Sequence, residues 1–329
     1  MLPHHTTSRA LLLAASLLAL ASAGCEDAQT QPVPVDFAIS DAPVGELDSV
    51  VITIDRITVN RPGPDIVVES FPAETPGDPD VDTITIDLLD FPGTAVKLVV
   101  QDLFLMPGAY QNVRLTILDN DIALTYVDET GGGIKPLVVP SGELKLGGFY
   151  VDAFWPQTFV LEFDLSKAMT YNPSPDRYIL KPRGVRIVDA QEASLLSGAV
   201  DPALFSAGGC GAKPDPLVGN VVYLYRGHGL DKSALADMFD PAVDTAAAQQ
   251  WIEPFASETV AADGSYLFAY LPADSYTLAF ACNAADDDSE VDDGITIPDP
   301  ASEWAELTLA PGEQRQCGFP VSAPGTCGS

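Results

Sequence analysis

Residues 159–166 read Phe-Val-Leu-Glu-Phe-Asp-Leu-Ser, and this stretch decides the fold class. Its odd-numbered positions are all apolar, while three of its four even-numbered positions are polar. This two-residue period is that of a β-strand with one buried face, and it does not suit a helix. Residues 83–88 repeat the alternation. Further strands are expected over residues 50–59, 110–118, 122–127, 178–188, 221–225, 266–271 and 304–309. The sequence therefore predicts an all-β fold.

The composition agrees with this prediction and excludes one class of partner. The chain of 329 residues contains 28 Pro and 26 Gly, which indicates many turns, and 47% of its residues are hydrophobic, which is enough for a globular core. Its formal net charge is −31, from 16 basic and 47 acidic residues. Nucleic acid is excluded as a partner, because binding it depends on Lys and Arg neutralising phosphates.

The first 25 residues carry an export signal. A polar start is followed by an apolar run over residues 10–20 and then by Ala21-Ser22-Ala23-Gly24-Cys25. The run is shorter than the ~20 apolar residues of a membrane-spanning helix. The segment resembles a bacterial lipobox, in which Cys25 would be lipidated, although Ser22 stands where that pattern prefers Leu. Cleavage by an ordinary signal peptidase at Ala21-Ser22-Ala23 is the alternative. We expect an exported protein, anchored by lipid in the bacterial cell envelope at the outer membrane.

The chain is expected to divide into a leader and two tandem β-sandwich domains of the Ig-like or prealbumin-like kind. We place a signal peptide at 1–24, a tether at 25–35, the first sandwich at 36–189, a linker at 190–197 and the second sandwich at 198–329. Two short helices are expected inside the second domain, over residues 231–238 and 245–251.

Cysteine usage separates the two halves. Apart from Cys25, the cysteines are Cys210, Cys282, Cys317 and Cys327, all in the second domain. An even number in an exported chain predicts two disulfides. Three pairings are open, and we favour Cys282 with Cys317, each in or at the end of a predicted strand, which leaves Cys210 with Cys327. Zinc is disfavoured, because the chain has no Cys-x-x-Cys spacing and a single histidine outside the leader.

Two resemblances to known families follow from short motifs. The first rests on blocks at residues 39–43, 51–59, 86–89, 106–110, 113–115, 139–141, 163–165 and 178–182. Through them residues 36–189 resemble the bacterial domain-of-unknown-function family 4382, which implies an exported all-β domain with no established reaction. Residues 263–268 and 271–276 make the second half similar to the carboxypeptidase-regulatory-like, or prealbumin-like, β-sandwich. Asp274 departs from that motif, which usually has Gly there.

A candidate calcium site lies in the densest run of acidic residues, 286–293. The expected ligands are Asp286, Asp288, Glu290, Asp292 and Asp293. Hard carboxylate oxygens packed this closely repel one another and gain by sharing a calcium ion. The spacing is not that of an EF-hand, and a solvated hairpin loop is the alternative. No other cofactor is expected.

Other reactive or aromatic groups have plain structural explanations. His228 lies between two glycines, which is typical of a loop. Four aspartates of the first domain could meet on one face: Asp41, Asp55, Asp87 and Asp164. Five aromatic residues of the second domain would stack on a sugar if they were exposed: Tyr223, Tyr225, Tyr266, Phe268 and Tyr270. We expect them in the core, because the last three share one face of one strand.

These observations favour a non-catalytic protein of the cell envelope. We expect a binding, scaffolding or adhesion module, with an envelope protein or a glycan as partner and with carbohydrate binding as a candidate activity. The alternative is a carboxylate-dependent extracellular glycan hydrolase. Two carboxylates facing each other about 5–9 Å apart beside exposed aromatic side chains would favour the hydrolase.

Overall fold

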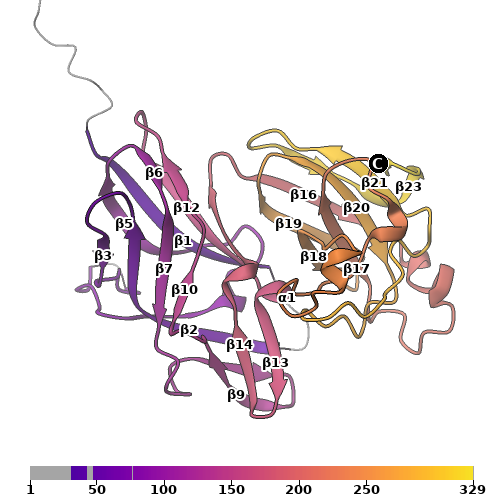
Figure 1. Cartoon of the computed structure of the whole chain (residues 1–329), viewed down its shortest axis with the longest axis horizontal. Coiled ribbons are helices and arrows are strands. Elements are labelled where there is room, and N and C mark those ends of the chain that lie inside the picture. The colour runs from indigo at the N-terminus through magenta and orange to yellow at the C-terminus, as the bar shows by residue number, and fades with distance from the viewer. Residues whose placement is uncertain (1–30, 43–46, 76, 329) are drawn as a thin grey trace, which may run out of the picture.

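The computed structural model of the protein describes residues 31–42, 47–75 and 77–328. Within these residues nearly all regular structure is β-strand, so the predicted all-β fold class is confirmed. Two groups of sheets lie next to each other, the first coloured indigo to pink and the second salmon through orange to yellow in Figure 1. We call them the first and the second sandwich. The expected signal peptide and the expected lipidation site, Cys25, lie outside the described residues.

One sheet of the first sandwich has four strands in the order β15-β12-β1-β5. β1 pairs in parallel with β12 and antiparallel with β5. These strands are β1 (Val33–Ala42), β5 (Lys97–Leu105), β12 (Gln157–Asp164) and β15 (Val185–Asp189). β1 thus begins three residues before the expected domain start, within the segment expected to be tether.

The other large sheet of the first sandwich is built around the long strand β2 (Leu47–Asn60), in the order β10-β7-β2-β8-β9-β14-β13. Its other strands are β7 (Asn112–Ile117), β8 (Tyr126–Glu129), β9 (Gly133–Val138), β10 (Glu143–Lys145), β13 (Met169–Pro173) and β14 (Asp176–Leu180). β3 (Ile66–Val68) and β4 (Ile84–Asp87) also pair with β2, and β6 (Gly108–Tyr110) pairs with β11 (Phe149–Val151). The two sheets enclose a mainly aliphatic core in which Ile52, Leu115 and Leu161 are fully buried.

Two predicted strands end earlier than their patterns suggested, and both breaks shape the junction of the sandwiches. β12 stops at Asp164, whose carboxylate accepts a hydrogen bond from the backbone N–H of Lys167 and caps the single-turn helix α1 (Leu165–Ala168). The stretch expected to be one strand over 178–188 is interrupted by a 3₁₀ turn that begins at Pro182, because Pro cannot donate to a ladder. α1 packs against this turn so closely that a Cβ on Gly184 would overlap the backbone of Ala168.

The second sandwich consists of two sheets and a short C-terminal hairpin. The sheets have the orders β18-β17-β20-β21 and β19-β16-β22. The strands are β16 (Ser194–Ala199), β17 (Val221–Arg226), β18 (Ala256–Thr259), β19 (Ser265–Leu271), β20 (Ser275–Ala281), β21 (Trp304–Thr308), β22 (Gln314–Gln316), β23 (Gly318–Ala323) and β24 (Thr326–Gly328). β17 and β20 are buried on both faces, because the segments 230–252 and 284–297 cover the face that points away from the sandwich core.

The helices expected over residues 231–238 and 245–251 are not formed. The first region holds only a 3₁₀ turn, after which Leu235 pairs with Ile252 in a parallel bridge. Hydrogen bonds to another segment thus replace those of a helix, while Leu235 and Met238 pack on Tyr223 and Tyr225. The 3₁₀ turns are η2 (Leu88–Asp90), η3 (Pro182–Gly184), η4 (Pro202–Ser206), η5 (Gly208–Cys210), η6 (Lys232–Ala234) and η7 (Ala247–Gln249).

Within the described residues, no helix is both long and apolar enough to cross a bilayer.

Candidate functional site

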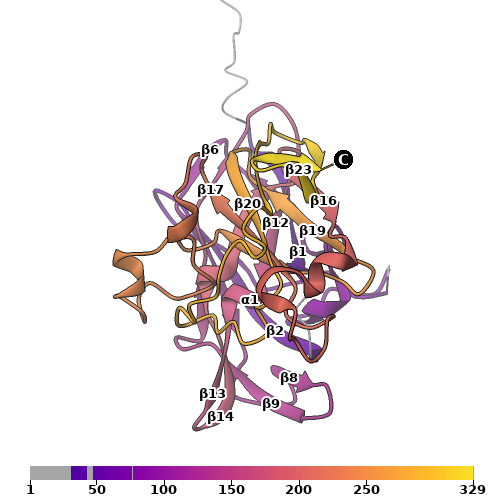
Figure 2. The ribbon, with the colours of Figure 1, turned by 90° about the vertical axis from the view of Figure 1, so that its right-hand side faces the viewer.

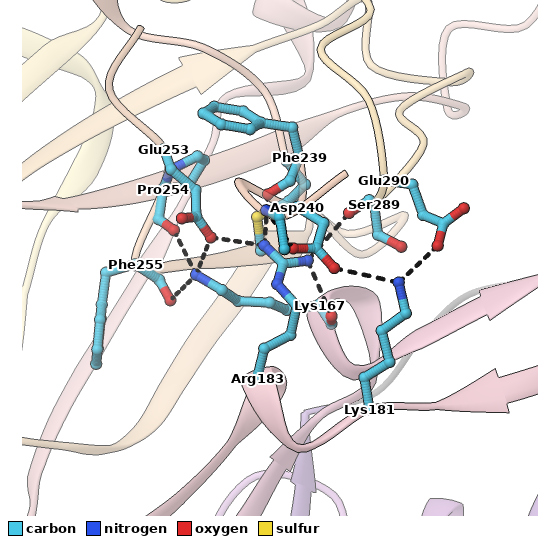
Figure 3. Close-up of polar contacts among 12 residues, drawn as sticks. Lys167, Lys181, Arg183, Phe239, Asp240, Glu253, Pro254, Phe255, Ser289 and Glu290 are labelled. Carbon is cyan, nitrogen blue, oxygen red and sulfur yellow. Dashed lines mark hydrogen bonds and ion pairs between the residues drawn. The ribbon is translucent and has the colours of Figure 1, made fainter. Parts of the chain in front are cut away.

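Three basic side chains of the first sandwich reach across the junction to three acidic side chains of the second (Figure 3). We call these contacts the junction ion pairs. They join Lys167 and Arg183 to Glu253, each with an N–O distance of 2.6 Å, and Lys181 to Asp240 at 3.1 Å and to Glu290 at 2.5 Å. Lys167 stands in α1, Arg183 in η3 and Lys181 directly before η3, so all three lie in or next to the elements created by the strand breaks.

Arg183 makes the most contacts of the three. Besides Glu253, its guanidinium donates to the backbone carbonyls of Lys167, Phe239 and Ser289. The Lys167 ammonium also donates to the carbonyl of Pro254 at 2.8 Å. Burial lowers the pKa of Lys167, and the carboxylate of Glu253 opposes that change. These contacts satisfy backbone carbonyls of both sandwiches, so the junction is held by charge-assisted hydrogen bonds.

A second group of charges at the junction is deeply buried and unbalanced. We call Asp41, Glu162 and Glu258 the buried carboxyls; their side chains are 1%, 2% and 7% exposed. Arg186 forms an ion pair with Glu162 at 2.9 Å. Among the described residues, neither carboxyl oxygen of Asp41 has a hydrogen-bond partner. Three acids thus share one close guanidinium.

Burial raises the pKa of all three buried carboxyls. The pKa of Asp41 rises to about 9, through loss of water and the nearby carboxylates of Glu162, Asp164 and Asp87. That of Glu162 rises to about 8, because burial outweighs the attraction of Arg186. The pKa of Glu258 is also raised by burial, with further repulsion from Asp164 and Glu162. At neutral pH Asp41 and Glu162 therefore favour the neutral, protonated form.

A groove of about 900 Å³ opens between the β13-β14 hairpin and the acidic loop of the second sandwich. Its wall on the first sandwich includes Glu129, Tyr171 and Tyr178, and its wall on the second includes residues 285–289. The rings of Tyr171 and Tyr178 are tilted against each other with centroids 5.1 Å apart, and Tyr171 is 45% exposed. The residues that line the groove include four carboxylates, and none of the described lining residues is Lys, Arg or His.

Two carboxylates of this groove, Glu129 and Asp287, are held by hydrogen bonds. Glu129 accepts from the Tyr178 hydroxyl at 2.8 Å. Both oxygens of Asp287 are engaged, one by the Tyr223 hydroxyl at 2.6 Å and the other by the backbone N–H of Met238 at 3.2 Å. Burial raises the pKa of Asp287 to about 6, against these hydrogen bonds. The groove thus presents fixed acceptors beside two aromatic rings.

The structure distributes the expected calcium ligands among different roles. Glu290 pairs with Lys181, while Asp288 and Asp292 accept from backbone N–H groups of their own loop. Asp286 lines the groove. Of the expected set, only Asp293 joins a cluster with carboxylate oxygens within 4.8 Å of one another, and its partners there are Asp237 and Asp287.

Sequence reasoning missed Asp237, which is fully buried and stands about fifty residues before the acidic loop. It accepts from the backbone N–H groups of Asp293 and Ile295. Its pKa rises to about 7, first through burial and then through the charges of Asp287 and Asp292. The signal that could have pointed to it is an acid inside an otherwise apolar segment, Leu235-Ala236-Asp237-Met238-Phe239.

Both disulfides are present, but the favoured pairing was wrong. The bonds join Cys210 to Cys282 and Cys317 to Cys327. β23 and β24 form a hairpin in which Gly318 pairs with Gly328, so the neighbouring Cys317 and Cys327 are brought together locally. Cys282, just after β20, instead meets the η5 turn that carries Cys210.

The remaining candidate residues lie mostly where the sequence placed them. Tyr223, Tyr225, Tyr266 and Phe268 are buried, as expected. Tyr270 is the exception, because a register shift in β19 and a left-handed backbone (φ 49°) turn it toward the first sandwich. There its hydroxyl donates to the carbonyl of Thr94 at 3.0 Å. A ring nitrogen of His228 lies 2.9 Å from the Leu307 carbonyl.

Comparison with known families identifies one part of the chain. Residues 33–182 match the family model described as "Domain of unknown function (DUF4382)". This matched segment contains β1 to β14, together with Lys167 and Lys181 of the junction ion pairs. No curated protein matches the sequence.

Similarity to solved structures is distant. The TIE protein of Bacillus anthracis is 10% identical with a TM-score of 0.20, over 88% of this chain and 33% of that one. The minor pilin GBS52 of Streptococcus agalactiae is 11% identical with a TM-score of 0.19, over 86% of this chain and 94% of that one. The shaft pilin SpaA of Lactobacillus rhamnosus GG is 10% identical with a TM-score of 0.20, over 88% and 97%. At these scores the functions of those proteins carry no conclusion about this chain.

Proposed function

We propose that the protein is a non-catalytic, glycan-binding module, anchored to the bacterial cell envelope by a lipid on Cys25. The groove between the sandwiches is its binding site. The observation that carries this proposal is the pairing of a partly exposed tyrosine, Tyr171, with fixed carboxylate acceptors in a groove of about 900 Å³. A volume of this size falls within the range of ligand sites, roughly 300–1,000 Å³.

The chemistry of the groove suits a sugar. The apolar face of a pyranose ring packs on an aromatic ring, while its hydroxyls donate to carboxylate oxygens. Tyr171 and Tyr178 supply the rings, and Glu129 and residues 286–288 supply the acceptors. Because the junction ion pairs fix one wall of the groove relative to the other, little ordering is needed when the ligand binds.

A glycan hydrolase is the second candidate, and Asp287 is the observation that favours it. A carboxyl whose pKa is about 6 is suited to act as a general acid, and Glu129 lies on the other wall of the same groove. Binding is favoured over hydrolysis because both oxygens of Asp287 already accept hydrogen bonds from Tyr223 and Met238. Glu129 is similarly engaged by Tyr178.

The cellular location of the protein is part of the proposal. Two disulfides suit an oxidising compartment outside the cytoplasm. Residues 26–32 would form a short tether between a lipidated Cys25 and β1. Mass spectrometry of the mature protein tests the anchor: an acylated N-terminal cysteine is expected, and an unmodified chain that begins at Gly24 would refute it.

A glycan-array screen of the chain from residue 26 onward, followed by calorimetry on the best ligand, tests the binding function. Tyr171→Ala should weaken binding at least tenfold, because it removes the exposed ring from the groove. Leu217→Ala is the matched control, since Leu217 is 51% exposed but lies outside the groove. Equal binding by the wild type and Tyr171→Ala, or no bound glycan, would overturn the proposal. Release of new reducing ends that is lost in Asp287→Asn would establish the hydrolase instead.

A further inference from the structure

Exposed apolar side chains gather at one end of the first sandwich. They are Phe104, Met106, Tyr150, Phe154 and Trp155, with exposures of 64%, 39%, 64%, 68% and 48%. We call these five residues the end patch. Scattered exposed apolar residues are normal, but a contiguous group of this kind marks an interaction site. The end patch does not contribute to either sandwich core or to the groove.

Strand register shows that the members of the end patch lie near one another. Phe104 is paired with Pro34 of β1, and Gln157, which follows the Phe154 loop, is paired with Val35. The β6-β11 pair brings Val151 opposite Gly108, which places the turn after Met106 beside the same loop. All of these segments therefore meet where β1 begins.

The tip of the end patch is held in a fixed shape. The backbone N–H of Asp152 donates to the side-chain oxygen of Gln157 at 2.6 Å, and that of Phe154 donates to the Asp152 carboxylate at 3.0 Å. Gln157 is itself buried and donates to Asp189 at 2.6 Å. The rings of Phe154 and Trp155, with centroids 6.0 Å apart, are thus presented to solvent by a closed loop. A preformed apolar tip loses little conformational entropy on binding.

We propose that the end patch inserts into the interfacial region of a lipid bilayer. Residues 26–32 separate Cys25 from β1, so an extended tether places the start of β1 within roughly 28 Å of a lipid on Cys25. The end patch surrounds that start. Trp, Tyr and Phe are the side chains that favour the membrane–water interface, because each combines an apolar ring with, in Trp and Tyr, a polar group.

The proposed contact between the end patch and the bilayer also determines which way the glycan-binding groove faces relative to the membrane. Figures 1 and 2 both show β6 at one end of the first sandwich and β13 and β14 at the other. β6 adjoins the end patch, while β13 and β14 carry Tyr171 and Tyr178 of the groove. A bilayer contact at the end patch therefore turns the groove away from the membrane. This orientation rests on the lipid anchor of the proposed function, whereas the bilayer contact itself does not require the lipid.

Vesicle flotation with the chain from residue 26 onward tests the inference without the lipid. The vesicles contain phosphatidylethanolamine and phosphatidylglycerol, or phosphatidylcholine alone. The wild type should float with both, because the five side chains of the end patch carry no charge. The double variant Phe154→Ser/Trp155→Ser should bind at least tenfold more weakly. Leu217→Ser/Val218→Ser is the control, because this adjacent pair is 51% and 46% exposed on the second sandwich and should leave binding unchanged.

Three results would overturn the inference. The wild type could stay with the vesicle-free fraction, the Phe154/Trp155 double variant could float as well as the wild type, or sedimentation without lipid could show a dimer that this variant abolishes. The last result would assign the end patch to a second copy of the chain. Melting temperatures equal to that of the wild type confirm that both double variants fold. Glycan affinity measured in solution reports on the groove alone, so failure of either proposal is recognised separately.

Discussion

The junction ion pairs and the buried carboxyls both place charged side chains away from water, and the charge of the two groups is compensated in opposite ways. The junction ion pairs set three basic side chains against three acidic ones, at N–O distances of 2.5–3.1 Å. The buried carboxyls set three acids against one close guanidinium, and Asp41 has no hydrogen-bond partner among the described residues. Both groups occupy the same junction and differ in how their charge is compensated.

This comparison indicates that the extent to which nearby cations compensate its charge decides whether a buried carboxyl group is ionised or protonated. In the junction ion pairs, each carboxylate accepts a hydrogen bond from an ammonium or guanidinium group, so a cation compensates its charge. In the buried group, burial raises the pKa values of Asp41 and Glu162 to about 9 and about 8, so that protons remove negative charge that cations do not compensate. The first group should respond mainly to removal of a partner, and the second mainly to pH.

The largest effect is expected from Arg183→Ala. The substitution leaves the Glu253 carboxylate with one cation and removes the donors to the carbonyls of Phe239 and Ser289. Breaking a partly buried ion pair in this way should lower the free energy of unfolding by about 3 kcal/mol. Urea unfolding followed by fluorescence measures the change.

The matched control for Arg183 is Arg56→Ala. Arg56 pairs with Glu69 at 2.7 Å, but the two side chains are 43% and 60% exposed. An exposed pair contributes below about 1 kcal/mol. Equal losses for the two variants would show that the junction ion pairs do not hold the sandwiches together.

The second prediction concerns pH. A carboxyl whose pKa is raised by folding binds more protons in the native state than in the unfolded state, so its contribution to stability is complete below about pH 4 and is lost as pH rises toward its folded value. For Asp41 and Glu162 that window runs from about pH 4 to about pH 8 or 9. Stability should therefore fall between pH 5 and pH 8, by up to about 1.4 kcal/mol per pH unit for each retained proton.

Asp41→Asn tests the origin of this slope. The amide stays neutral, so the plot of unfolding free energy against pH should become flatter, whatever the absolute stability of the variant. Asp65→Asn changes an exposed aspartate and should leave the slope unchanged. A wild-type stability that rises from pH 5 to pH 8, or a slope that Asp41→Asn does not alter, would contradict the prediction.

The smallest effect is expected from calcium, which remains a prediction. A third group of acids, Asp237, Asp287 and Asp293, brings carboxylate oxygens within 4.8 Å of one another, and its members range from fully buried Asp237 to exposed Asp293. If calcium binds there, a concentration ten times its Kd should stabilise the protein by about 1.4 kcal/mol. Asp293→Asn should remove this gain, while Asp292→Asn should retain it. An unchanged melting curve at several millimolar calcium would leave a solvated loop.

The alternating pattern of residues made the strands, the all-β class and the buried aromatic residues predictable. Residues 159–164 form a strand as their two-residue period predicts, although all six residues and not one face alone are buried, and Tyr266 is buried as expected. The breaks at Asp164 and Pro182 were harder to predict, because a capping carboxylate and a 3₁₀ turn each override a continuing apolar pattern. Those breaks create the elements that carry Lys167 and Arg183.

The junction itself could not be predicted from one sequence. Lys181 and Glu290 are 109 residues apart, and no local sequence pattern at either residue indicates that the two form an ion pair. The predicted disulfide pairing was wrong for a related reason. Cys282 and Cys317 each lie in or at the end of a predicted strand, but the C-terminal hairpin closes the shorter loop between Cys317 and Cys327. Asp41, one of the four aspartates that could meet on one face, lies at the buried end of β1.

The parallel pairing of β1 with β12 has a consequence for the way the protein is made. Val35 meets Gln157, and Asp41 meets Phe163, so β1 cannot complete its sheet until β12 has been synthesised. Contacts so distant along the chain slow folding, because the intervening segment must first be closed into a loop. Until then β1 exposes an unpaired edge, which is the kind of surface that aggregates. If the chain is anchored as proposed, neighbouring copies of that edge would lie in one plane beside the bilayer.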